Sequence, residues 1–176
     1  MSRPELSLFS YEILGLVGGE GVSAHDLLRM AKRDRLLDWA GESQYYVEPK
    51  RLAGLGYLEA RKEPGRTRER TVYSLSDKGL EALKAWARTP LAFTPVKSEP
   101  LLRLLVADLV GADVSRESIG TLRDDIALLQ GQVDEMEARA AELPHRETSL
   151  VLTARFLRRL LELHLEFVDE VERELR

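Results

Sequence analysis

The sequence contains no cysteine, which rules out disulfides, thiolate metal sites and cysteine nucleophiles. Its three histidines, His25, His145 and His164, lie far apart and have no second histidine or paired carboxylates at metal-ligand spacing. A Ser-His-Asp pattern is also missing, and no Lys-Ser/Thr pair of a phosphate loop follows the glycines near residue 18. We therefore expect no metal, no cofactor and no enzymatic activity.

Long apolar runs are absent as well. Although 44% of the 176 residues are apolar, no run approaches the ~18 uncharged apolar residues that a membrane helix needs. The first residues, MSRPELSLFSYEIL, lack the small-residue cleavage pattern of a secretory signal. We expect a cytoplasmic protein that has no membrane partner.

The net charge of −4 is unevenly distributed along the chain. Residues 1–89 hold 15 Lys+Arg and 13 Asp+Glu, a balance of +2, whereas residues 90–176 hold 11 and 17, a balance of −6. Because local charge determines the field at a surface, the acidic total is compatible with a basic face in the first half. It argues against a protein that coats nucleic acid over its whole surface.

A proline-containing stretch, TPLAFTPVKSEP at residues 89–100, separates two regions with different patterns. We place a domain boundary there, which gives a first domain at 1–89 and a second, helical domain at 98–176. Ser98 and Pro100 are typical of a helix start, because the first turn leaves its N–H groups unpaired and proline has none to lose.

The first domain has the helix order of a winged helix-turn-helix. Apolar residues recur at helical spacing over residues 6–17. Ser23 is suited to cap a second helix, and Ser43 to cap a third that ends before Gly56. Ser76 is suited to cap a fourth helix that follows two predicted strands. The fold class we predict is mainly α: three helices, a two-stranded wing and a fourth helix, followed by a helical region.

The predicted wing carries a cluster of cations. Two alternating segments, 57–62 and 70–75, flank a Pro64-Gly65 turn and predict two strands. The residues expected to face inward are Leu58, Ala60, Tyr73 and Leu75. The cations near the turn are Arg61, Lys62, Arg66, Arg68 and Arg70. Arginine binds phosphate oxygens through a forked geometry, so the loop predicts contacts with a DNA backbone. The alternative is a hairpin that carries charge for solubility and to protect an edge strand.

The third helix is the candidate for contacts with base edges. Its hydroxyl, amide and cationic groups are able to reach phosphates or the major groove. These groups belong to Ser43, Gln44, Tyr45, Tyr46, Lys50 and Arg51. One of the two tyrosines is expected in the core instead. Pro49 removes a helical hydrogen bond at a cost of ~3 kcal/mol, so the helix either starts later than Ser43 or is kinked.

The second domain shows two heptad patterns, which predict two long helices after a shorter one. Apolar residues alternate at intervals of three and four over 119–143, and Pro144 ends that helix. We assign the heptad positions of the last helix to dimerisation: Leu150, Leu157, Leu161, His164, Val168, Val171 and Leu175. The same helix has a further apolar flank of Leu152, Phe156, Leu160, Leu163 and Phe167. Such a flank is typical of a surface that binds a partner.

Three aromatic residues, Trp39, Trp86 and Phe93, lie near the predicted domain junction. Aromatic side chains in such a place are suited to line a pocket for a flat apolar ligand, and ordinary packing at the junction is the alternative.

Two motifs of the first domain match a known family over about residues 6–88. The first consists of Gln44-Tyr45-Tyr46, Arg51-Leu52 and Leu55-Gly56-Tyr57-Leu58, and the second is Arg68-Glu-Arg70-Thr-Val-Tyr73-Ser-Leu75-Ser76-Asp-Lys-Gly79-Leu80. The domain thereby resembles the PadR family of winged-helix transcriptional regulators, and the two long helices are similar in pattern to its larger members.

The resemblance implies a homodimeric repressor that binds a palindromic operator in double-stranded DNA and is released by a small aromatic effector. It places Gln44, Tyr46, Lys50 and Arg51 in the major groove, and Arg66 and Arg68 on the adjacent backbone. Many relatives have leucine where this chain has Pro49. The alternative function is a winged-helix module that uses the hairpin and the acidic long helices to bind another protein.

Overall fold

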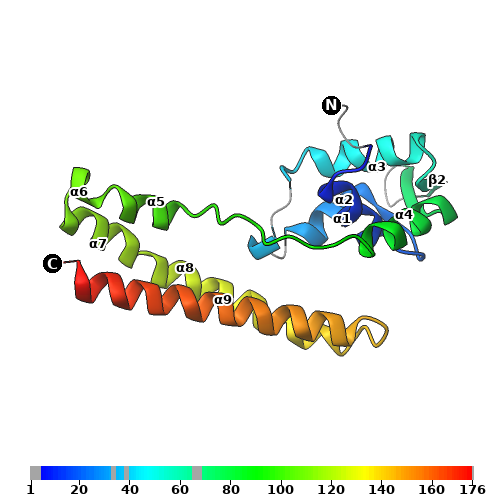
Figure 1. Cartoon of the computed structure of the whole chain (residues 1–176). Coiled ribbons are helices and arrows are strands. Elements are labelled where there is room, and N and C mark those ends of the chain that lie inside the picture. Colours follow the sequence, from blue (N-terminus) through cyan, green and yellow to red (C-terminus); the bar gives the residue numbers. More distant parts are fainter. Residues whose placement is uncertain (1–4, 33–34, 38–39, 65–68, 176) are drawn as a thin grey trace. The chain divides into compact units, whose positions relative to one another are not determined.

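The computed structural model describes residues 5–32, 35–37, 40–64 and 69–175. The chain forms two compact units, residues 1–92 and 93–176, and most of the described residues are helical (Figure 1). Within the described residues, no helix is both long and apolar enough to cross a membrane.

The first unit is a small helical domain with one antiparallel sheet. In chain order its elements are α1 (Leu8–Val17), β1 (Val22–Ser23), α2 (Ala24–Ala31), a 3-10 turn (Arg35–Leu37), α3 (Gln44–Gly54), β2 (Leu58–Glu63), β3 (Arg70–Leu75) and α4 (Asp77–Ala87). Its core contains Ile13, Leu14, Val17, Leu27, Tyr45, Leu52, Tyr57, Leu58 and Tyr73. Amphipathic helices therefore surround the base of the sheet, as expected for a winged helix.

Three serines cap helices of this unit. Ser7 and Ser10 form a reciprocal capping box at α1, Ser23 accepts from the Asp26 N–H, and Ser76 accepts from the Gly79 N–H. The caps predicted at Ser23 and Ser76 are confirmed. The cap predicted at Ser43 is wrong, because Ser43 has helical φ and ψ and its side chain makes no capping bond. A turn in which Gln44 N–H donates to the Gly41 carbonyl leads into α3 instead.

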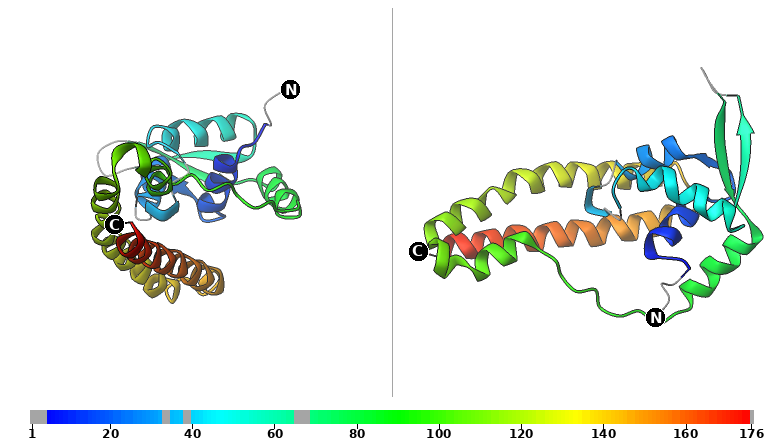
Figure 2. Two further views of the ribbon diagram at one scale, coloured as in Figure 1. Left: turned by 60° about the vertical axis from the view of Figure 1, so that its left-hand side comes forward. Right: turned by 90° about the horizontal axis from the view of Figure 1, so that it is seen from above.

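The sheet has three strands rather than two, in the order β1-β3-β2. Val22 pairs with Tyr73 and Ser23 with Val72, and two residues are too few to show an alternating pattern in the sequence. The β2–β3 ribbon projects from the helices (Figure 2, right). Ala60, predicted to face inward, is exposed because the ribbon has left the core at that point.

All regular secondary structure in the described part of the second unit is helical. Its helices are α5 (Glu99–Leu105), α6 (Ala107–Val110), α7 (Ala112–Gly120), α8 (Leu122–Ala140) and α9 (Glu147–Glu174). The sequence predicted three helices, and the structure has five because breaks at Val106 and at Thr121 each divide one predicted helix in two. The first and second predicted helices are separated at Gly111, whose φ is 103°. The predicted cap at Ser98 and the helix break before Pro144 are both present.

Helices α8 and α9 lie side by side and antiparallel (Figures 1 and 2). The heptad residues assigned to dimerisation lie on the side of α9 that packs within the chain. Leu157, Leu161, Val168 and Val171 are buried, and Leu150, His164 and Leu175 are half-buried. The four buried residues therefore pack within the chain, and the apolar surface that α9 leaves exposed is its other flank, with Leu152, Phe156 and Leu163. The residues of the dimer interface stay a prediction.

Candidate nucleic-acid interface

One face of α3 is exposed along its length. The exposed row consists of Ser43, just before the helix, and Gln44, Tyr46, Val47 and Lys50, and all but Val47 are among the predicted DNA-binding residues. Arg51 is exposed as well, but its guanidinium is paired with Glu48. The row combines one cation with hydroxyl, amide and apolar groups. Such groups are suited to phosphate, base-edge and thymine-methyl contacts in a major groove.

Tyr45 does not belong to that face. Its side chain is only 3% exposed, its hydroxyl donates to Glu12 Oε1 at 3.0 Å, and its ring meets Phe9 edge-on with centroids 5.0 Å apart. The prediction that Tyr45 contacts DNA is wrong, because this tyrosine is the core member of the pair while Tyr46 is exposed.

Pro49 lies inside α3, which begins at Gln44. Of the two alternatives for this residue, a later helix start is not observed. The ring is fully buried in the first unit. Pro49 therefore contributes packing rather than a contact with DNA.

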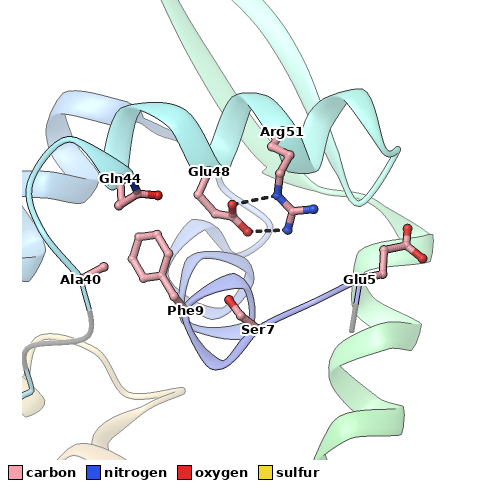
Figure 3. Close-up of a pocket in the computed structure, with 7 residues that line it drawn as sticks. All are labelled: Glu5, Ser7, Phe9, Ala40, Gln44, Glu48 and Arg51. Atoms are coloured by element: carbon pink, nitrogen blue, oxygen red, sulfur yellow. Dashed lines mark hydrogen bonds and ion pairs between the residues drawn. The ribbon is translucent and has the colours of Figure 1, made fainter. Parts of the chain in front are cut away.

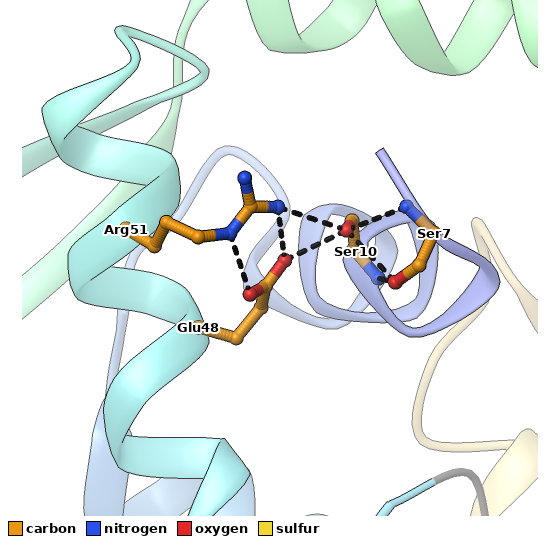
Figure 4. Close-up of polar contacts among 4 residues, drawn as sticks. All are labelled: Ser7, Ser10, Glu48 and Arg51. Carbon is orange, nitrogen blue, oxygen red and sulfur yellow. Dashed lines mark hydrogen bonds and ion pairs between the residues drawn. The ribbon is translucent and has the colours of Figure 1, made fainter. Parts of the chain in front are cut away.

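Glu48 and Arg51 form an ion pair that points from α3 toward α1 (Figures 3 and 4). Arg51 Nε donates to Glu48 Oε2 at 2.8 Å, and Arg51 Nη2 donates to Oε1 at 2.7 Å. The buried Ser10 hydroxyl also donates to Oε1, at 2.7 Å, and its oxygen lies 3.3 Å from Arg51 Nη2. The pair thus connects the predicted recognition helix to the capped start of α1.

The arrangement keeps both partners charged. The hydrogen bonds from Arg51 lower the pKa of the Glu48 carboxyl although burial opposes them, and the bond from Ser10 adds to the effect. The same pair raises the pKa of Arg51. Sequence analysis assigned Arg51 to the major groove and missed Glu48 and Ser10. The i, i+3 spacing of an acid and an arginine was the available signal.

A cleft of about 570 Å³ opens beside this pair (Figure 3). It is lined by Glu5, Ser7, Phe9, Ala40, Gln44, Glu48 and Arg51. Its lining includes two carboxylates and one guanidinium, and the guanidinium is already paired with one of the carboxylates. The cleft therefore has no uncompensated cation among these lining residues.

The wing presents cations that are partly neutralised. Arg61 and Arg70 both pair with Glu63, and Arg70 also lies 3.7 Å from Asp26. Hydrogen bonding from Arg61, followed by the charge of Arg61 and the contacts of Arg70, lowers the pKa of Glu63. Lys62 is exposed. The predicted phosphate contacts Arg66 and Arg68 lie outside the described residues.

The turn between α3 and the wing is held by the start of α4. Ser76 Oγ donates to the Gly56 carbonyl at 2.7 Å, and Lys78 Nζ donates to the Leu55 carbonyl at 2.7 Å. The Lys78 ammonium also lies 4.1 Å from the centroid of the Tyr57 ring. These contacts fix the position of the wing relative to the exposed face of α3.

The three residues of the predicted aromatic ligand site belong to different parts of the chain. Trp86 stacks on Tyr11 with centroids 4.7 Å apart and an angle of 10°, within the first unit. Phe93 is 92% exposed and belongs to the second unit, and Trp39 lies outside the described residues. The ligand site stays a prediction.

The chain is similar to solved structures of PadR-like regulators along nearly its whole length. Bacillus subtilis PadR in complex with operator DNA is 21% identical, with a TM-score of 0.68 over 96% of this chain and 98% of that chain. PadR in complex with p-coumaric acid is 19% identical, with a TM-score of 0.60 over 96% and 99%.

Two further proteins have the same architecture. The Vibrio cholerae virulence activator AphA is 22% identical, with a TM-score of 0.72 over 94% of this chain and 96% of that chain. The PadR-like transcriptional regulator BC1756 from Bacillus cereus is 15% identical, with a TM-score of 0.70 over 98% and 100%. No family model and no curated protein matches the chain. The likenesses confirm the predicted fold, a winged helix followed by a helical region.

Proposed function

We propose that the protein is a PadR-like transcriptional regulator that binds operator DNA through α3 and the wing. The observation that carries the proposal is the exposed row of α3, with Gln44, Tyr46 and Lys50, beside a projecting two-stranded ribbon. These elements belong to a fold that is shared with PadR, which has been solved with operator DNA. Lys50 and Lys62 supply exposed cations for phosphates, and Gln44 supplies an amide for a base edge.

We further propose that the protein acts as a homodimer on palindromic DNA and represses by occupying the operator. Two α3 helices about 34 Å apart would fit successive major grooves on one face of the duplex. The exposed flank of α9 supports a partner surface. A small aromatic effector is proposed from the complex of PadR with p-coumaric acid.

The proposal is tested by selecting genomic fragments that the purified protein binds and measuring their affinity at two salt concentrations. We expect a shared palindromic sequence with a dissociation constant on the order of 10⁻⁸ to 10⁻¹¹ M at physiological salt. The affinity should fall steeply as salt rises, because phosphate contacts release counterions. Failure to enrich any sequence, together with no binding at low salt, would refute a DNA-binding function.

The sequence-predicted role of the wing gives a separate prediction. Replacing Arg66 and Arg68 with alanine should weaken binding to all duplexes and flatten the dependence of log affinity on log salt by ~0.9 per lost phosphate contact. Fluorescence anisotropy with labelled duplexes measures both quantities. The matched control is Lys84→Ala with Arg88→Ala, which removes one exposed cation from α4 and one from the residue that follows it. If the wing variant keeps the wild-type slope, these arginines do not contact phosphate.

A further inference from the structure

We propose that Glu48 is a specificity-determining residue of the DNA-binding helix: by neutralising Arg51, it limits the attraction of α3 for the phosphates of any sequence. The inference rests on the proposed function and extends it to an acidic residue that makes no contact with DNA itself.

The first observation is the completeness of the pairing. Glu48 is 7% exposed, and both of its oxygens accept from the Arg51 guanidinium at 2.7–2.8 Å. Ser10, which is fully buried, gives Oε1 a further donor at 2.7 Å. The carboxylate is thus fixed from two helices, and the guanidinium is held in one orientation by a bidentate contact.

The second observation is the net charge of α3 after Glu48 and Arg51 have paired. Between Gln44 and Gly54 the helix carries Glu48, Lys50 and Arg51, a balance of one minus and two plus, or +1. Because Glu48 and Arg51 neutralise each other, Lys50 on the exposed row is the remaining charge of the helix. Yet the Arg51 side chain is 40% exposed, and its Nη1 points away from Glu48 (Figure 4). A guanidinium without its carboxylate would be free to reach a phosphate.

The third observation is where Arg51 points. Its guanidinium points from α3 toward α1, beside the cleft that Gln44 also lines (Figure 3). A complex held in register by base contacts depends on the hydrogen-bonding groups of the exposed row, whereas a freed guanidinium would add only charge. A loosely oriented complex with arbitrary DNA would gain a phosphate contact, and such contacts supply essentially all of non-specific affinity. Neutralisation by Glu48 therefore favours discrimination.

Stability alone does not explain a carboxylate at this position. Glutamine has the same shape, and its one carbonyl oxygen is able to accept from Arg51 Nη2 and Ser10, the two donors that now meet Oε1, although its NH2 group cannot accept from Arg51 Nε. Buried ion pairs are often no more stabilising than uncharged replacements that fill the same space. What glutamine would not reproduce is the cancellation of the arginine charge.

The test varies the charge of the pair while keeping its shape. The pair has a charge of 0 in the wild type and in the Glu48→Gln, Arg51→Gln double variant, +1 in Glu48→Gln, and −1 in Arg51→Gln. Affinity for a duplex of arbitrary sequence should rise with the charge of the pair, from −1 through 0 to +1. At low salt, Glu48→Gln should bind such a duplex about 3–10-fold more tightly than the wild type does. Its salt slope should be steeper by up to ~0.9. The ratio of specific to non-specific affinity should fall in the same variant, and the double variant should restore it.

Glu81→Gln is the matched control, because Glu81 pairs with Lys84 on α4 and its loss also frees one cation. Circular dichroism establishes that each variant is folded. If Glu48→Gln does not fold, the comparison of Arg51→Gln with the double variant still varies the charge by one unit. If the affinity for DNA of arbitrary sequence is the same at every charge of the pair, the role of Glu48 is overturned and the proposed function is not. A wild type that binds no duplex would overturn the proposed function itself.

Discussion

Replacing Gly79 with alanine should destabilise the first unit by ~3 kcal/mol and lower its melting temperature by roughly 12–24 °C. A Cβ at this position would overlap the Tyr57 carbonyl oxygen and lie 2.8 Å from Leu75 Cδ1. The carbonyl belongs to the backbone and cannot rotate away as a flexible side chain would. The start of α4 would have to move away from the turn that joins α3 to the wing.

The same movement would break the contacts that orient the proposed DNA-binding surface. Ser76 and Lys78 bind the carbonyls of Gly56 and Leu55 from the first turn of α4. The Ser76 N–H also donates to the Tyr57 carbonyl at 3.3 Å. We therefore expect specific DNA affinity to fall with stability, even at temperatures where the variant is folded.

Both tryptophans of the chain belong to residues 1–92, so thermal denaturation followed by intrinsic fluorescence reports on the first unit. The matched control is Gly54→Ala, because a Cβ at Gly54 meets no atom within 4 Å and the backbone of Gly54 itself is not left-handed. The control should be neutral or stabilising by up to ~1 kcal/mol. If the Gly79→Ala protein has the same melting temperature as the wild type, the overlap relaxes at no cost in stability.

The sequence predicted the four α-helices and the two wing strands of the first unit because these elements have local signals. Ser23 and Ser76 cap helices through bonds to residues three positions later, and Gly56 has a φ of 79° at the end of α3. These interactions depend only on neighbours in the chain. Periodicity likewise predicted the two strands of the wing and the two long helices of the second unit.

The candidate site could be predicted only in part, because its chemistry depends on packing between helices. Tyr45 and Tyr46 are adjacent on one turn, and only the position of α1 decides which of them is buried. The sequence pattern predicts an exposed cation at Arg51, but in the structure its guanidinium donates to Glu48 and to Ser10, which is distant in the chain. The strand β1 and the helix breaks of the second unit are similarly too short or too dependent on context for a pattern to indicate them.

The proposed dimer gives the second large effect: Phe156→Glu should raise the dissociation constant of the dimer by about 100-fold or more. Phe156 is 66% exposed on α9, on the same flank as Leu152 and Leu163. A carboxylate there would have to lose its water in any interface that covers the flank. The fold should survive, because the neighbouring Leu157 and Leu161 pack within the chain and are unchanged.

Sedimentation equilibrium over a range of protein concentrations measures this effect, and circular dichroism verifies the helical content. Arg155→Gln is the matched control, since it makes the same one-unit change in charge on a neighbouring exposed position of α9. Because palindromic operators are bound by two half-sites at once, the monomeric variant should also lose most of its specific affinity while it keeps weak binding to a half-site. A Phe156→Glu protein with the wild-type dissociation constant would place the dimer interface elsewhere than the exposed flank of α9.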